Sequence, residues 1–254
     1  MTKIKAFFFD QDGVIIDTEK DGHRVAFNRT FIKHGLNFEW SEEEYHGLIQ
    51  ISGGKERMIH YLRTKGFGRE IRPEEEAQLI QQLHLDKTDE FISMLEKNEL
   101  PLRPGIHRFM CEINQLGLTL AICTTSNQRA AQAVADGMLP DIKFDFILAG
   151  DMVSKKKPDP EIYVAAMIKA GLTPEECVVV EDSENGVTAG KAAGMHVVAT
   201  TNYYTEKEDL SQADIVVSCL GDPDGEKGKL RAGGKGMNYD GVLTATQIVD
   251  YFSS

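Results

Sequence analysis

The sequence predicts an α/β fold, a doubly wound parallel sheet with an α-helical domain inserted after its first strand. Short apolar runs alternate with helical patterns along most of the chain. These runs are continuously apolar, as expected for strands of a parallel sheet that is covered on both faces. Residues 18 to about 100 contain no such run and are rich in helix-forming residues, which predicts the insertion.

The core elements follow one another in a regular order. Strands are expected at 4–10, 118–125, 144–151, 177–182, 196–200 and 214–218, and helices at about 105–116, 127–137, 159–170 and 184–193. Alternation of strands and helices implies right-handed crossovers in one sheet. The glycine-rich, charged segment 221–241 is expected to form a loop, and residues 242–252 a last helix.

The inserted segment ends at "LPLRPG", where Pro101 and Pro104 mark the return to the alternating pattern. We therefore expect two domains. The α/β core comprises residues 1–17 and 101–254, and a helical cap domain comprises residues 18–100.

Composition and charge restrict the partners of this chain of 254 residues. The net charge of -12 argues against nucleic acid or an anionic membrane as the main partner, but not against a small anion held in a local cleft. The four cysteines are far apart and are expected to be reduced. Because no apolar run approaches the length of a signal peptide or a membrane span, we expect a soluble, cytoplasmic protein. We also expect it to be a monomer.

Acids and hydroxyls stand where the predicted strands end. The strand ends carry Asp10 and Asp12, Thr124 and Thr125, Asp151 followed by Lys155, Lys156 and Lys157, and Glu181 and Asp182. In open parallel sheets, ligands bind beyond the carboxyl ends of the strands. Each residue alone is weak evidence, since acids at strand ends often belong to turns or caps. Their occurrence on successive strands predicts one shared site.

Several carboxylates in one site call for a cation. Two unit charges about 4 Å apart repel by roughly 4 kcal/mol at an effective dielectric constant of 20. Oxygen ligands without cysteine or histidine suit Mg²⁺. A carboxylate there could attack phosphorus, and a hydroxyl, backbone amides and a lysine are the groups that hold a phosphoryl's oxygens. The residues therefore favour phosphoryl transfer through an aspartate.

Four segments resemble motifs I to IV of the haloacid dehalogenase (HAD) superfamily: "DQDGVIIDT", "TTSN", "KKKPDP" and "VVVEDSENG". The resemblance covers nearly the whole chain and implies a Rossmann-like HAD core. One departure is Gln11 between the two aspartates, where an apolar residue or cysteine is more usual. The chemistry should tolerate it, because only the backbone there needs to be fixed.

This resemblance implies a role for each motif residue. Asp10 would be the nucleophile, and Asp12 the general acid/base. Thr124 would bind the phosphoryl group, and Lys157 would neutralise charge beside it. Mg²⁺ would be held by Asp10, the Asp12 carbonyl and Asp182, with Glu181 nearby, while Lys155 and Lys156 would be surface charges.

A finer resemblance is to the β-phosphoglucomutase-like subgroup and its CbbY-type proteins, which include xylulose-1,5-bisphosphate phosphatases. It is carried by "GGKERM", "HLDKT", "LPLRPG" and "CLGDPDGEKG". It implies a Mg²⁺-dependent phosphatase acting on a small phosphorylated sugar, such as a pentulose bisphosphate. A sugar phosphomutase is the alternative enzyme, and a receiver-like signalling module the alternative non-enzyme. A dehalogenase is disfavoured, because it would leave Asp12 and Asp182 without a metal or phosphate.

Selectivity for the sugar is expected from the cap domain. "SGGKERM" places Gly53 and Gly54 before Lys55 and Arg57, which suits an anion at a helix N-terminus. His84 and Lys87 of "HLDK" share one helical face. These charges could equally be ordinary solvated residues, and His23 an ordinary helix histidine. By resemblance, Glu19 would accept a sugar hydroxyl, and the candidate substrate-binding residues are Glu19, His23, Gly53, Gly54, Lys55, Arg57, His84, Lys87, Thr125 and Ser126. "GGKGM" lacks the full phosphate-loop pattern and is set aside.

Overall fold

The computed structural model describes residues 3–49, 51, 53–126, 128–150 and 152–253. The chain divides into two compact units, which are described separately. The core unit is Met1–Asp17 with Pro101–Ser254, and the helical unit is Thr18–Leu100. Asp151 lies outside the described residues. Within these described ranges, no helix has both the length and the apolar character needed to cross a bilayer.

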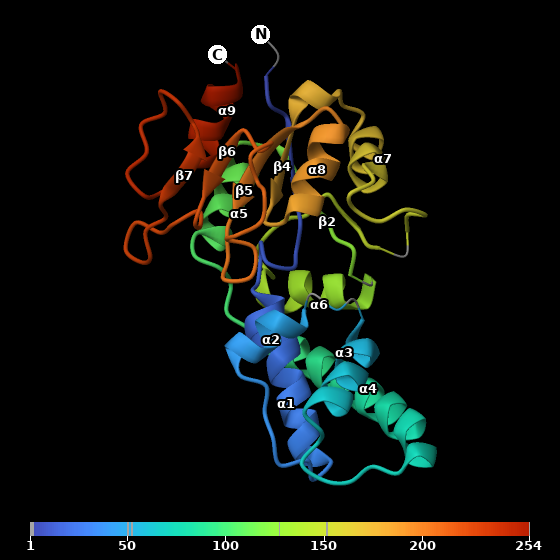
Figure 1. The fold of residues 1–254 in the computed structure, drawn as a ribbon. Coiled ribbons are helices and arrows are strands. Elements are labelled where there is room, and N and C mark those ends of the chain that lie inside the picture. The colour runs from blue at the N-terminus through green and yellow to red at the C-terminus, as the bar shows by residue number, and fades with distance from the viewer. Residues whose placement is uncertain (1–2, 50, 52, 127, 151, 254) are drawn as a thin grey trace. The chain divides into compact units, whose positions relative to one another are not determined.

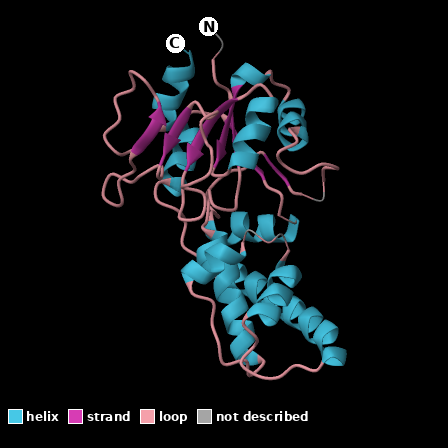
Figure 2. Cartoon of the chain, viewed as in Figure 1, coloured by secondary structure: helices cyan, strands magenta, loops and turns pink. Residues whose placement is uncertain are grey.

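The core unit is built on a sheet of seven strands in the order β3-β2-β1-β4-β5-β6-β7 (Figures 1 and 2). Neighbouring strands from β3 to β6 are parallel, which confirms the predicted α/β class. β1 lies in the middle and pairs with both β2 and β4. The strands are β1 Ala6–Phe9, β2 Thr119–Cys123, β3 Phe146–Leu148, β4 Cys177–Glu181, β5 His196–Thr200, β6 Ile215–Val217 and β7 Leu230–Gly233.

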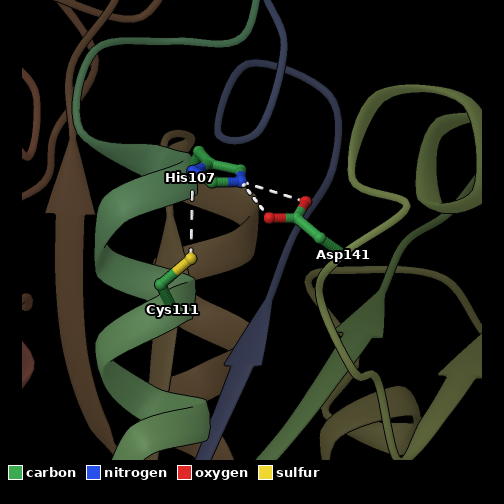
Figure 3. A group of neighbouring side chains, drawn as sticks. All are labelled: His107, Cys111 and Asp141. Carbon is green, nitrogen blue, oxygen red and sulfur yellow. Dashed lines mark hydrogen bonds and ion pairs between the residues drawn. The ribbon is translucent and has the colours of Figure 1, made fainter.

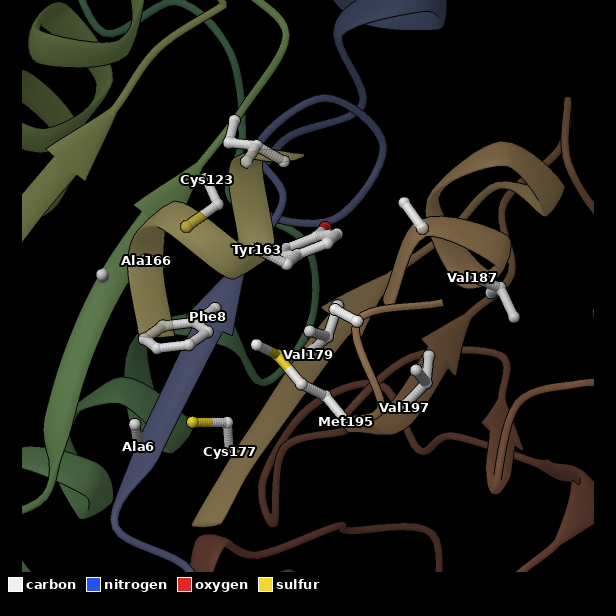
Figure 4. Close-up of a cluster of buried hydrophobic side chains, with 14 of the residues drawn as sticks. Ala6, Phe8, Cys123, Tyr163, Ala166, Cys177, Val179, Val187, Met195 and Val197 are labelled. Atoms are coloured by element: carbon white, nitrogen blue, oxygen red, sulfur yellow. The ribbon is translucent and has the colours of Figure 1, made fainter. Parts of the chain in front are cut away.

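Helices cover both faces of this sheet, which explains the three consecutive phenylalanines of β1. Phe8 belongs to a buried cluster with Tyr163 of α7 and Val187 of α8 (Figure 4). Phe7 and Phe9 both pack edge-on against Phe109 of α5. The helices of this unit are α5 Ile106–Gln115, α6 Gln128–Met138, α7 Glu161–Ala170, α8 Glu184–Ala192, α9 Ala245–Ser253 and the short 3₁₀ helix η2 Pro174–Glu176.

One prediction about the core is wrong. The segment 221–241, expected to be a loop, contains β7, which pairs antiparallel with β6 at the sheet edge. All four residues of β7 are exposed, so the strand lacks the apolar run that marked the others. Hydrogen bonding to β6 therefore defines it, rather than burial.

The helical unit consists of η1 Thr18–His23, which is a π-helix, α1 Arg24–Lys33, α2 Glu42–Leu48, α3 Gly54–Thr64 and α4 Pro73–Glu96. Local signals set several boundaries: Ser41 and Glu44 form a capping box on α2, and Pro73 occupies the start of α4. The interior is aromatic: the Trp40 ring is stacked on Tyr45, tilted against Phe27 and edge-on to Phe31. Its buried rings are Phe27, Phe31, Trp40, Tyr45, Tyr61, Phe67 and Phe91.

Candidate active site

Asp10 follows β1 directly and is buried, with 7% of its surface exposed. Its backbone N–H donates to the carbonyl of Val180 at 2.9 Å, which continues the pairing of β1 with β4 beyond the last strand residue. Because β4 then ends at Glu181, this pairing brings the acids of the two strands together at the carboxyl edge of the sheet. The acidic residues that follow β1 and β4 thus form one cluster.

Lys157 lies within this cluster. Its ammonium donates to Asp10 Oδ1 at 2.5 Å, to Glu181 Oε1 at 2.6 Å and to the carbonyl of Cys123 at 3.0 Å. Burial alone would lower the pKa of Lys157, but the carboxylates of Asp10 and Glu181 raise it, so the side chain is a cation. Tyr163 adds a second donor to Glu181 Oε1 at 2.6 Å.

Three buried carboxylates form a candidate metal centre. Oxygens of Asp10, Glu181 and Asp182 all lie within 4.8 Å of one another. Burial raises the pKa of Asp182, and the charges of Glu181 and Asp10 raise it further; burial also raises the pKa of Asp10. Lys157 contacts only two of these acids, so negative charge remains to be balanced. The oxygen-only donors and this charge fit a divalent cation.

The Asp12 side chain contacts hydroxyl groups rather than the other acids. Its Oδ2 accepts from the hydroxyl of Ser126 and, at 3.5 Å, from the hydroxyl of Thr124. Thr124 Oγ1 in turn accepts from the backbone N–H of Ser126 at 3.1 Å. Its other oxygen, Asp12 Oδ1, has no hydrogen-bond partner among the described residues. The Asp12 side chain thus lies with the hydroxyls and outside the acidic cluster, so a metal contact would fall to its carbonyl.

The remaining predicted residues of the core unit lie around these contacts. Thr125 is half-buried between Thr124 and Ser126. Lys155 and Lys156 are exposed, and Lys155 forms an ion pair with Asp159 at 3.3 Å. Of the three consecutive lysines, Lys157 is the one that enters the acidic cluster.

Two motif glycines make room for the acids. Gly13 has a φ of +83°, and a Cβ built on it would lie 2.1 Å from Asp182 Oδ2. A Cβ on Gly186 would lie 1.9 Å from the carboxyl carbon of Glu181. The close approach of the carboxylates therefore requires glycine in both "DQDG" and "EDSENG", and at Gly13 the backbone conformation requires it as well.

Sequence reasoning missed several residues that hold the site in place. Asn202 Nδ2 donates to Asp182 Oδ2 at 2.7 Å. Arg103 donates to the carbonyl of Gly13 and, at 2.8 Å, to the hydroxyl of Thr200, which ties the loop after β1 to the end of β5. Only Arg103 had a signal, its position within "LPLRPG". Asn202 lies in a segment without a motif, and its role follows from tertiary placement.

The helical unit contains a second polar network, built around Tyr45. Arg57 donates to Tyr45 Oη at 3.0 Å, and Tyr45 donates to Glu19 Oε2 at 2.6 Å. Arg57 also donates to the carbonyl of Ile51 at 2.9 Å. The helix α3 begins at Gly54 with Gly53 as its N-cap, so Lys55, which is exposed, lies in its first turn. Tyr45 was not predicted, because no motif contains it.

His23, His84 and Lys87 form a further group in the helical unit. Lys87 donates to His23 Nδ1 at 2.9 Å and is only 8% exposed. Its ammonium lies 4.8 Å from the centre of the Phe27 ring. Burial lowers the pKa of His23 well below its usual value, and the charge of Lys87 lowers it further, so His23 is neutral. His84 packs beside Gly54, where a Cβ would lie 3.1 Å from its ring.

Comparisons with known proteins agree with the motifs. The family model for the haloacid dehalogenase-like hydrolases matches residues 4–194. A "CBBY-like protein" from Arabidopsis thaliana is 45% identical over 227 residues, which cover 87% of this chain and 71% of that protein. A phosphorylated carbohydrates phosphatase from Thermotoga maritima is 31% identical and covers 76% of this chain and 82% of that protein.

The fold is also similar to a solved structure. The crystal structure of a CbbY mutant from Rhodobacter sphaeroides in complex with xylulose-(1,5)bisphosphate has a TM-score of 0.67. It is 36% identical in sequence, and the match covers 85% of this chain and 94% of that one. The similarity therefore extends over most of both chains.

Proposed function

Because the chain belongs to the haloacid dehalogenase-like hydrolase family, we propose that it is a phosphatase that hydrolyses a phosphorylated sugar through an aspartyl-phosphate on Asp10. The observation that carries the proposal is the buried contact of Lys157 with Asp10 and Glu181 at the ends of β1 and β4. A lysine so placed balances the charge on the nucleophile and on an incoming phosphoryl group.

Each residue of the core site has a part in the two steps. Asp10 attacks phosphorus, so that an oxygen–phosphorus bond forms to its carboxylate while the bond to the sugar oxygen breaks. Asp12 gives a proton to that leaving oxygen and then takes one from the water that hydrolyses the aspartyl-phosphate. Thr124 and Ser126, whose hydroxyls donate to Asp12, would donate to phosphoryl oxygens when the substrate is bound.

We propose Mg²⁺ as the cofactor, held by Asp10, Asp182 and the carbonyl of Asp12, with Glu181 beside it. A bound divalent cation would neutralise the buried carboxylates and the charge on the phosphoryl oxygens. Gly13 and Asn202 act on this set indirectly, since one leaves space for Asp182 and the other donates to it.

For the substrate we propose a pentulose bisphosphate such as xylulose-1,5-bisphosphate. Support comes from the 36% identity to the CbbY protein whose structure contains that compound. The helical unit would bind the part of the substrate that is not transferred. Its candidate residues for this role are Glu19, His23, Gly53, Gly54, Lys55, Arg57, His84 and Lys87, with Thr125 and Ser126 from the core unit.

A panel of sugar monophosphates and bisphosphates tests the proposal, with released phosphate and isomerised sugar measured in the presence of Mg²⁺. We expect phosphate release, fastest with a pentulose bisphosphate. Formation of an isomeric sugar phosphate in place of free phosphate would instead identify a phosphomutase.

Asp10→Asn provides the residue-level test. Uncatalysed phosphate-monoester hydrolysis is accelerated by up to ~10²¹-fold by enzymes, so no other group should compensate for a lost nucleophile. We expect this variant to release no phosphate at an unchanged melting temperature. Asp224→Asn, at an exposed position, is the matched control and should be fully active. Turnover by Asp10→Asn would rule out the aspartyl-phosphate mechanism.

A further inference from the structure

A cluster of three side chains lies on the surface of the core unit, formed by residues outside the acidic site (Figure 3). His107 and Cys111 are four residues apart on α5 and therefore lie on one face of the helix. Asp141 comes from the segment that follows α6. Figure 3 shows the imidazole between the thiol and the carboxylate, with a different ring nitrogen directed at each.

Both ring nitrogens of His107 have a polar side chain within hydrogen-bond reach. Nε2 lies 2.9 and 3.0 Å from the two oxygens of Asp141, which is direct hydrogen-bond geometry. Nδ1 lies 3.8 Å from the sulfur of Cys111. Ligands of a tetrahedral zinc ion, with bonds of about 2.3 Å to sulfur and about 2.05 Å to nitrogen, are separated by about 3.6 Å. The thiol and the imidazole are thus spaced like two ligands of one ion.

We propose that His107 Nδ1 and Cys111 Sγ bind a divalent transition metal ion such as Zn²⁺, with Asp141 as the carboxylate that orients the histidine. Asp141 accepts the Nε2 proton and so leaves the lone pair of Nδ1 directed toward Cys111. Metal-binding histidines commonly donate their second nitrogen to a carboxylate in this way. On binding, Cys111 would release its thiol proton to solvent as the sulfur–metal bond forms.

The surroundings favour a cation over a reactive thiol. The carboxylates of Asp141 and Glu112 lie close enough to Cys111 to act on it electrostatically. The same negative charges attract a metal ion, which is able to deprotonate a thiol. The side chains of His107 and Asp141 are 47% and 60% exposed, so an ion can reach them from solvent.

The donor atoms separate this site from the acidic cluster. A thiolate and an imidazole select zinc, cobalt or copper, whereas the oxygens of Asp10, Glu181 and Asp182 select Mg²⁺. The proposed site is therefore independent of catalysis at Asp10, and neither function requires the other. With two protein ligands, water would complete the coordination.

Titration of the whole protein with Co²⁺ in excess Mg²⁺ tests the proposal, because a cobalt–thiolate bond gives a charge-transfer absorption that oxygen ligands do not. The other three cysteines are buried, so the signal reports on Cys111. We expect it to saturate at one equivalent and to be displaced by Zn²⁺. Cys111→Ser and His107→Gln should each abolish it, and Asp141→Asn should weaken cobalt binding by about 10- to 100-fold.

His60→Gln, which changes an exposed histidine elsewhere, is the matched control and should bind Co²⁺ like the wild type. Circular dichroism of each variant checks that the fold is retained. Absence of the absorption in the wild type, or its survival in Cys111→Ser, would overturn the proposal. Binding that survives Cys111→Ser but is lost in Asp141→Asn would do so as well, since the ligands would then be His107 and Asp141.

Discussion

Asp182 occupies the space that a side chain on Gly13 would need, since a Cβ there would lie 2.1 Å from Asp182 Oδ2. The same oxygen accepts a hydrogen bond from Asn202 at 2.7 Å. The loop after β1 and the end of β4 are therefore in close contact through the Asp182 carboxylate. We therefore expect a change at Gly13 in the first motif to disturb Asp182 in the last.

Gly13→Ala should remove most of the phosphatase activity and lower the melting temperature moderately. A residue with a side chain at φ +83° is strained by about 1–2 kcal/mol, and the new methyl group must also displace Asp182. We expect a reduced melting temperature, loss of most phosphatase activity and a higher Mg²⁺ concentration for half-maximal rate. The measurement is a Mg²⁺ titration of activity at a temperature where the variant is folded.

Gly117→Ala is the control for this prediction. Gly117 also has a positive φ, of +67°, but a Cβ there would meet no atom within 4 Å. It should show a similar loss of stability and keep its activity and Mg²⁺ dependence. If the two variants lose activity equally, backbone strain rather than the displaced carboxylate is responsible.

Gln11→Met should stabilise the protein. The side chain of Gln11 is fully buried, and neither atom of its amide has a partner within the described part of the chain. A buried polar group left unpaired costs about 1–3 kcal/mol, whereas an apolar side chain of similar length avoids this cost. We expect the melting temperature to rise by several degrees with phosphatase activity unchanged.

The comparison for Gln11 is Gln78→Met, made at an exposed position of α4, which should leave the melting temperature nearly unchanged. A lower melting temperature for Gln11→Met would mean that the amide has a partner in the folded protein, such as a bound water. The unusual residue between the two aspartates would then contribute to the structure.

Asp12→Ala should affect substrates according to their leaving group. Asp12 has one carboxylate oxygen without a partner among the described residues, which could carry the proton that the leaving oxygen receives. General acid catalysis contributes typically 10²–10⁴-fold. We expect a loss of that order on a sugar phosphate and a smaller loss on p-nitrophenyl phosphate, whose leaving group needs no proton. Equal losses in kcat on the two substrates would contradict the leaving-group role.

The fold was predictable from the sequence for those strands whose residues are all buried. Strands such as β1 and β4 are buried at every position, so they appear as continuous apolar runs. β7 was missed because all its residues are exposed and its pairing with β6 is a property of the backbone. Periodicity detects a strand only when side chains contact a core.

The site was predictable to a similar degree and for a similar reason. Acids at strand ends converge because the strands are parallel and adjacent, so order along the chain was sufficient to group Asp10 with Glu181 and Asp182. Asn202 and Tyr45 reach their partners through loop and helix packing, which no local pattern records. The hydrogen bonds of these two residues depend on the tertiary structure alone.

Acid should destabilise the protein partly through His23. Its folded pKa lies well below the usual value of about 6.5, because of burial and then the charge of Lys87. Below pH 6.5, and down to the folded pKa, His23 binds a proton in the unfolded chain but not in the folded protein. Stability is therefore complete above pH 6.5 and falls by up to about 1.4 kcal/mol per pH unit as the pH decreases toward the folded pKa.

His23→Gln isolates this contribution, because a glutamine oxygen can still accept from Lys87 but does not titrate. We expect the free energy of unfolding of the variant to fall less than that of the wild type between pH 6.5 and 5. His60→Gln changes an exposed histidine and should follow the wild type. Parallel curves for the wild type and His23→Gln would show that His23 is protonated in the folded protein.

The last prediction concerns Arg57, which we propose to bind the phosphate that is not transferred. Arg57 is already fixed by hydrogen bonds to Tyr45 and to the carbonyl of Ile51, so little conformational entropy would be lost on binding an anion. Loss of a hydrogen bond to a charged group costs roughly 1.5–3 kcal/mol. Arg57→Ala should thus lower kcat/KM for a sugar bisphosphate by about tenfold to 150-fold.

A small monophosphate has no second phosphate, so its kcat/KM should be nearly unchanged by Arg57→Ala. Arg57→Lys should recover only part of the loss, because an ammonium cannot form the paired hydrogen bonds of a guanidinium. Arg63→Ala is the matched control on the same helix α3, where Arg63 is exposed and paired with Glu76. It should leave both substrates unaffected. If Arg57→Ala weakens both substrates equally, Arg57 supports the Tyr45 network rather than a second phosphate, and the proposed bisphosphate loses its residue-level support.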